Sequence, residues 1–134
     1  MKPLFLAAAV LAAGAASAGH LDIGVSGAKF SGRTITFLSV TIDKPGYLVI
    51  HATADGAPVI AGAIGATMVR PGTTENVKVC IAEPIMNGTG YVAMLHYETN
   101  GNTTYEFGEG MTDVDGPALK ADGSIYKTMF ETGM

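Results

Sequence analysis

Hydrophobic and polar residues alternate in short runs along most of this chain. The clearest run is 33–42, which is rich in β-branched residues and predicts a half-buried strand. Its alternation changes parity midway, because Ile35 and Phe37 share one face and the next apolar residues share the other. A β-bulge or a bend just after Phe37 would bring both sets of side chains to the same side.

Two further runs are apolar on both faces. They are 47–52 (Tyr-Leu-Val-Ile-His-Ala) and 91–97 (Tyr-Val-Ala-Met-Leu-His-Tyr), and strands of this kind belong in the middle of a sheet. Additional strands are predicted near 21–30 and at 75–81, 103–107 and 124–130. The apolar segment 59–69 contains two glycines and fits either a strand or a short irregular crossing.

Turn-forming pairs separate these runs, and no stretch of ten or more residues keeps a helical period. About seven short strands divided by Gly and Pro turns predict an all-β fold: a single antiparallel β-sandwich of the immunoglobulin-like type. In such a sandwich the strands 47–52 and 91–97 occupy the two central positions of one sheet and lie side by side.

The first eighteen residues have the pattern of a secretory signal peptide. Lys2 precedes an apolar stretch over 4–13, and the small residues 16–18 follow it. The apolar stretch is far shorter than the roughly 20 residues that cross a bilayer. We therefore expect cleavage after Ala18, with 1–18 as the signal peptide. The mature β-sandwich domain would cover 19–134, without a transmembrane segment, in the periplasm or outside the cell.

Composition and charge narrow the classes of function. The chain has 134 residues and a formal net charge of −4, which argues against an electrostatically driven nucleic-acid binder. Residues 98–134 hold seven acidic residues and two lysines, so the excess of negative charge lies in the last third. The single cysteine excludes an intrachain disulfide framework.

Five groups of residues together carry a resemblance, and they are 45–51, 75–79, 93–96, 99–107, and 115–117 with 122–123. The chain from about Phe37 to Phe130 resembles an uncharacterised β-sandwich domain family, which is found in exported and cell-surface proteins of haloarchaea and some bacteria. The chain departs from that pattern at Glu98, where aspartate is usual, and at Ala118, where an aromatic residue is common. The resemblance implies an exported β-domain and no particular reaction.

His51 and His96 are the first candidates for chemistry, because each lies in one of the two predicted central strands. Directly opposite residues on neighbouring strands have Cβ atoms about 4.5–5.5 Å apart, so two histidines in register on one face could share a metal ion. Imidazole suits copper or zinc. His20, near the expected new N-terminus, could add a further ligand. The alternative is that both strand histidines are packed and hydrogen-bonded within the sheet.

A blue-copper site would also need a cysteine and usually a methionine close to the second histidine. Cys80 stands 16 residues before His96, and Met111 stands 15 residues after it. This spacing argues against such a site, and Cys80 is predicted to be a small buried hydrophobic residue.

Oxygen-bearing side chains at alternate positions form a second candidate site, for calcium. Counted from Glu98, they fall at positions 1, 3, 5, 7, 9 and 12 of an EF-hand-like loop. The Asn-Gly pair at 100–101 is also a strong hairpin signal, and a hairpin of 91–97 with 103–107 would leave no loop to surround an ion. The hairpin is the stronger signal. The calcium-loop residues are Glu98, Asn100, Asn102, Thr104, Glu106 and Glu109.

Motifs of common enzyme classes are absent from the sequence. It contains no Gly-x-Ser-x-Gly elbow, no phosphate-binding Gly-rich loop and no His-Glu-x-x-His pair. We predict an exported, non-catalytic module with a structural or binding role, whose partner is an unidentified protein or small ligand. The alternatives are a periplasmic copper- or zinc-binding protein that uses the strand histidines, and a calcium-stabilised surface module.

Overall fold

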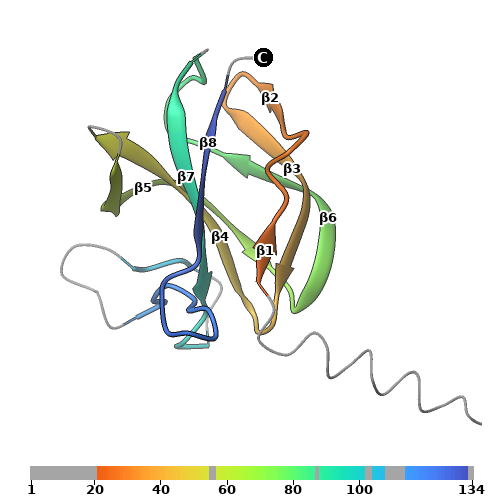
Figure 1. Ribbon diagram of the computed structural model, residues 1–134, viewed down its shortest axis with the longest axis vertical. Coiled ribbons are helices and arrows are strands. Elements are labelled where there is room, and N and C mark those ends of the chain that lie inside the picture. The colour runs from red at the N-terminus through yellow and green to blue at the C-terminus, as the bar shows by residue number, and fades with distance from the viewer. Residues whose placement is uncertain (1–20, 55–56, 87, 102–103, 108–113, 133–134) are drawn as a thin grey trace, which may run out of the picture.

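The computed structural model describes residues 21–54, 57–86, 88–101, 104–107 and 114–132. These residues contain eight strands and no helix, and therefore no helix that could cross a membrane (Figure 1). The expected signal peptide at 1–18 and His20 lie outside the described residues. The strands are β1 (Asp22–Ile23), β2 (Lys29–Ser31), β3 (Thr34–Ile42), β4 (Gly46–Ala54), β5 (Ala57–Val69), β6 (Gly72–Cys80), β7 (Gly90–Tyr97) and β8 (Lys127–Glu131).

The strands form two antiparallel sheets, as a β-sandwich requires. In the first sheet β3 is central, with β6 on one side and β1 and β2 paired in succession along the other. The second sheet has the order β5-β4-β7-β8, so β4 and β7 are its central strands. The β-sandwich prediction is confirmed, as is the side-by-side placement of 47–52 and 91–97.

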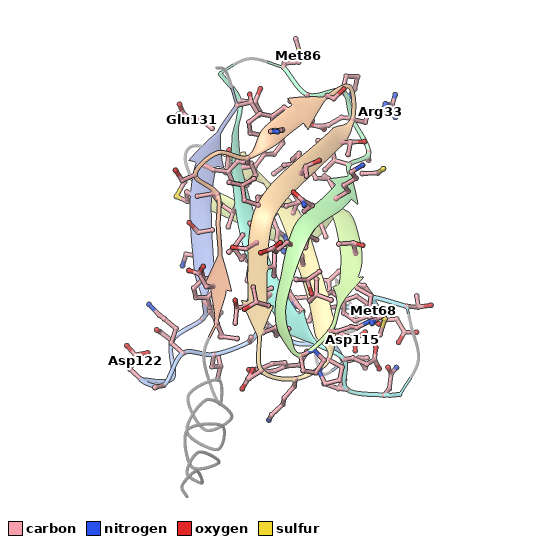
Figure 2. The ribbon with its side chains drawn as sticks, turned by 90° about the vertical axis from the view of Figure 1, so that its right-hand side faces the viewer. Arg33, Met68, Met86, Asp115, Asp122 and Glu131 are labelled. Carbon is pink, nitrogen blue, oxygen red and sulfur yellow. The ribbon has the colours of Figure 1, made fainter. Side chains whose placement is uncertain are left out.

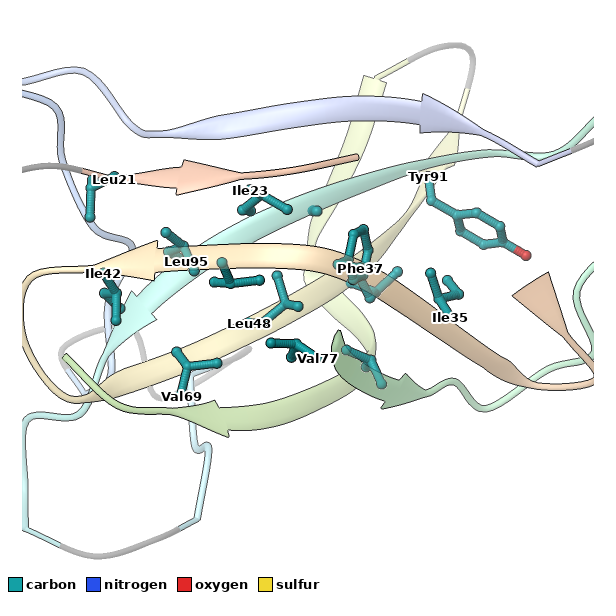
Figure 3. Close-up of a cluster of buried hydrophobic side chains, with 14 of the residues drawn as sticks. Leu21, Ile23, Ile35, Phe37, Ile42, Leu48, Val69, Val77, Tyr91 and Leu95 are labelled. Carbon is teal, nitrogen blue, oxygen red and sulfur yellow. The ribbon is translucent and has the colours of Figure 1, made fainter. Parts of the chain in front are cut away.

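Side chains from both sheets fill the space between them (Figure 3). The ring of Phe130 on β8 packs edge-on against Phe37 of β3, with centroids 5.5 Å apart, and lies 5.9 Å from the ring of Tyr91. Complete burial of one large apolar side chain stabilises a fold by about 1.5–3 kcal/mol. The core residues include Ile35, Phe37, Val40, Ile42, Leu48, Ile50, Val77, Val79, Tyr91, Ala93 and Leu95.

Strand β3 bends where its alternation changes parity. Phe37 and Val40 are both buried in the core, whereas Leu38 between them is 45% exposed. The pairing of β3 with β6 keeps one register on both sides of Leu38, so the irregularity is a bend and not a bulge. Asn76, at the matching position of β6, has a φ of 55°, and the left-handed backbone there absorbs the distortion.

The side of β6 that points away from the core carries the single cysteine. Val77 and Val79 point into the core, and Cys80 alternates with them and is exposed beside Thr34, with 3.7 Å between Sγ and Oγ1. The prediction of a buried Cys80 is therefore wrong, because strand alternation outweighs the residue's preference for burial.

The segment 59–69 is part of a strand, β5, and an irregular one. Its register with β4 shifts on both sides of His51. The carbonyl oxygen of Ile64 accepts a hydrogen bond of 2.8 Å from the amide of Ala82, which follows β6. Gly65 permits this approach, because a Cβ there would lie 2.5 Å from the carbonyl oxygen of Cys80. Strand β5 thus connects the edges of the two sheets.

Candidate functional site

The central strands β4 and β7 bury side chains on both of their faces. The even-numbered residues Leu48 and Ile50 enter the core between the sheets. Their odd-numbered neighbours on β4, together with the even-numbered residues of β7, point to the other side, which we call the outer face. Six residues of the outer face are at most 2% exposed, and they are Tyr47, Val49, His51, Val92, Met94 and His96.

His51 and His96 share the outer face but are not directly opposite each other. Tyr47 pairs with His96, and His51 pairs with Val92. The two imidazole rings nevertheless lie close together, with centroids 5.9 Å apart and planes inclined by 32°. Both side chains are 0% exposed. The structure therefore brings together the two strand histidines that the sequence singled out.

His96 is held in one tautomer by the backbone. Its Nδ1 lies 2.8 Å from the carbonyl oxygen of Asp115, and because a carbonyl can only accept, Nδ1 carries the hydrogen. The lone pair of the neutral ring is therefore on Nε2, which lies 3.5 Å from the hydroxyl of Tyr105. The pKa of His96 is lowered to about 4, chiefly by burial and to a smaller extent by the neighbouring His51, although the hydrogen bond to Asp115 acts in the opposite direction.

A segment that follows β7 covers the outer face. We call residues 98–101, 104–107 and 114–117 the cap. Asp115 anchors the cap: its buried carboxylate accepts hydrogen bonds from the amides of Thr99 (3.0 Å) and Glu106 (2.9 Å). The amide of Asp115 donates in turn to the Thr99 hydroxyl, at 2.8 Å. In Figure 2, Asp115 and Met68 of β5 both lie toward the end of the molecule opposite Arg33.

Acidic and amide side chains of the cap bond to one another and to the sheet. The hydroxyl of Tyr47 donates to the carboxylate of Glu98, and burial together with Glu98 raises the pKa of Tyr47. The other oxygen of Glu98 accepts the amide of Asn100 at 2.9 Å. The side-chain amide of Asn100 donates to Glu106 at 2.5 Å.

Aromatic rings of the cap lie against His96 and Tyr47. The ring centroid of Tyr105 is 5.0 Å from that of His96 and 5.5 Å from that of Tyr47. The ring centroid of Phe107 lies 5.1 Å from that of His96. These contacts help to bury His96 and lower the dielectric around its imidazole ring.

The predicted hairpin after β7 is wrong in its second strand. Gly101 has a φ of 78°, as a turn at Asn100-Gly101 requires, but residues 104–107 do not form a strand. The carboxylate of Asp115 takes the amide of Glu106, and Tyr105 packs on His96, so this segment folds over the sheet and does not extend it.

Part of the predicted calcium loop lies outside the described residues, namely Asn102 and Glu109. Glu98, Asn100 and Glu106 are drawn together by the hydrogen bonds of the cap. Within the part of the chain that the structure describes, no group of three or more His, Cys, Asp or Glu side chains could hold a metal ion.

Sequence reasoning missed Asp115 as an anchor, because an Asp-Gly-Pro triplet is typical of an exposed turn. It also passed over Met94 and Tyr105. One signal was available: central strands that are apolar on both faces, in a fold of two sheets, need a further layer to cover the outer one.

Comparisons with known proteins place the chain in a family. No curated protein matches it, and no solved structure matches it. Residues 22–131, from β1 to the end of β8, match the family described as Domain of unknown function (DUF7282). This match covers both sheets and the cap. The chain therefore belongs to the DUF7282 family.

Proposed function

We propose that this chain is an exported, non-catalytic β-sandwich module with a structural or binding role. The observation that carries the proposal is the use of the cap's polar side chains. The carboxylate of Asp115 binds backbone amides, Glu98 accepts the hydroxyl of Tyr47, and His96 donates to the backbone. A catalytic acid, base or nucleophile must reach its substrate, whereas these groups are committed to holding the cap on the sheet.

Two features of the sequence support export and a protein or small ligand as the partner. The pattern of 1–18 is that of a cleaved signal peptide. The acidic last third of the chain disfavours nucleic acid and leaves a protein or small ligand as the partner class. The module would work in the periplasm or outside the cell.

Cell fractionation and hydrogen exchange together test this proposal. When the full chain is expressed in a bacterium, we expect it in the periplasm or medium with Gly19 as its first residue. In the purified protein, the amides of Thr99 and Glu106 should exchange as slowly as those of β4 and β7, because both are bonded to buried Asp115. A cytoplasmic, uncleaved chain would contradict export, and fast exchange of both amides would contradict a closed cap.

A second candidate function is metal binding by His51 and His96. It is supported by the 5.9 Å separation of two fully buried rings and by the Asp115 carbonyl, which leaves the lone pair of His96 on Nε2. Titration with copper and zinc ions of the natural chain and of a His51→Asn/His96→Asn double variant tests it. Equal affinity in the two proteins would rule out this site.

A further inference from the structure

The outer face carries a third side chain that can bind a metal, Met94. It is fully buried, and it lies on the side of the sheet opposite the main core. In the register of β4 with β7, Met94 pairs with Val49. This pair is the row between the one that contains His96 and the one that contains His51.

The register puts the Met94 side chain within reach of both imidazoles. His96 lies two residues along the same strand and therefore on the same face. His51 is a diagonal neighbour across the pair, and diagonal neighbours are about 7–8 Å apart, a distance that long side chains span. The two rings lean toward each other over this middle row, since their centroids are 5.9 Å apart.

The hydrogen bonding of His96 is that of a metal ligand. Metal-binding histidines commonly donate one ring N–H to a backbone carbonyl, which fixes the ring and leaves the other nitrogen for the metal. Nδ1 of His96 donates to Asp115 in this way, and Nε2 makes a long contact of 3.5 Å with the Tyr105 hydroxyl. Nε2 of His51 is itself buried.

This set of donors selects the metal. A structural zinc site takes four nitrogen, oxygen or thiolate ligands, and no such cluster exists within the described residues. A thioether is a soft ligand that favours monovalent copper, and imidazole also suits copper. We propose that His51, Met94 and His96 form a buried site for monovalent copper beneath the cap. This inference rests on the second function proposed above and adds the third ligand and the oxidation state.

The surroundings match a single positive charge. The three ligands are neutral, so the bound ion would keep its charge, and a buried charge needs an opposite one nearby. The Asp115 carboxylate is buried in the cap, and the backbone of the same residue holds His96. The rings of Tyr105 and Phe107 lie over His96, and an apolar cover of this kind limits the access of water to a metal.

Titration with copper(I) tests the site. The purified chain, without oxygen and with ascorbate as reductant, competes for copper(I) against a coloured chelator. We expect one copper(I) ion per chain, with sulfur and nitrogen neighbours in the X-ray absorption spectrum. Met94→Leu keeps nearly the same volume, so the fold should survive. It should weaken binding by about tenfold or more, since even loss of a group behind a ligand costs about 10–100-fold.

Met86→Leu is the matched control, because Met86 lies outside the strands and is 66% exposed. It should leave binding unchanged. His51→Asn tests the imidazole separately, and circular dichroism reports whether each variant is folded. If His51→Asn does not fold, the affinity and the sulfur signal of Met94→Leu decide the question.

Three results would overturn the copper(I) proposal. They differ in whether they also contradict metal binding by the two histidines. If the natural chain does not hold copper(I) against the chelator, the three-ligand site fails, and metal binding then depends on the divalent-ion titration. If it binds, and only His51→Asn weakens binding, the thioether is not a ligand and the two-histidine function remains. If neither variant weakens binding, the copper(I) ion lies elsewhere on the chain and the three-ligand site fails, and the divalent-ion titration decides the two-histidine function.

Discussion

The buried, neutral His96 predicts a specific loss of stability in mild acid. In the unfolded chain this imidazole has its ordinary pKa of 6.5, whereas in the folded protein its pKa is about 4. Below pH 6.5 the unfolded chain therefore gains a proton that the folded chain does not. The free energy of unfolding falls as the pH decreases, and the loss is complete just below pH 4.

The two pKa values give the size of the effect. Each unit between them corresponds to about 1.4 kcal/mol, so His96 alone should remove about 3 kcal/mol of stability, most of it between pH 7.5 and 4.5. Carboxylates also titrate near the lower end of this range. A variant that lacks only the imidazole, His96→Asn, keeps those carboxylates and an amide that can donate to Asp115.

Urea unfolding of the metal-free natural chain and of His96→Asn, each at pH 7.5 and at pH 4.5, measures how much stability each protein loses in acid. The chain has five tyrosines and no tryptophan, so tyrosine fluorescence and circular dichroism are the suitable signals. We expect His96→Asn to be less stable than the natural chain at pH 7.5 and to lose about 3 kcal/mol less on acidification. An NMR titration of the His96 ring should show no protonation above pH 5. Equal losses in the two proteins, or a pKa near 6.5, would refute the reasoning.

Three further predictions concern the cap and the central strands. Asp115→Ala leaves the amides of Thr99 and Glu106 without their acceptor and should lower the free energy of unfolding by about 2–4 kcal/mol; a loss below about 0.5 kcal/mol would contradict the anchoring role. Gly46→Ala should destabilise by about 2 kcal/mol or more, because the new Cβ would meet the His96 carbonyl oxygen, whereas Gly116→Ala has open space and should change little; equal melting temperatures would argue against this close approach. Millimolar calcium should leave the melting temperature unchanged, since Tyr47 and Asn100 occupy the Glu98 carboxylate, and a clear rise over a chelator control would favour the calcium loop.

The architecture followed from the sequence where local pattern and tertiary packing agree. Strands β4 and β7 are apolar on both faces, and this property alone placed them at the centre of a sheet. The parity change in β3 required a bend or a bulge, and the structure contains a bend at Leu38. Strand β5 was ambiguous because its glycines and register shifts weaken the alternation that identifies a strand.

The cap could not be predicted because its bonds join residues whose local preferences indicate other structures. Asn100-Gly101 favours a hairpin, and Asp115 with the Gly-Pro pair after it favours an exposed turn. Both preferences give way to contacts that exist only after β4 and β7 have paired. The prediction for Cys80 was wrong for the opposite reason. It followed the general tendency of cysteine to be buried, whereas the alternation of side chains along β6 was the better guide.

The position of the cap in the chain has a consequence for folding. It lies between β7 and β8 and closes on the face of the sheet to which both strands belong. His96 and Tyr47, which it covers, are in place only after β4 and β7 have paired. Closure is therefore a late event, and a chain that has formed its sandwich but not its cap exposes a continuous apolar patch on the outer face. During that interval the protein would be prone to self-association, and the rate of cap closure would set how long it depends on chaperones.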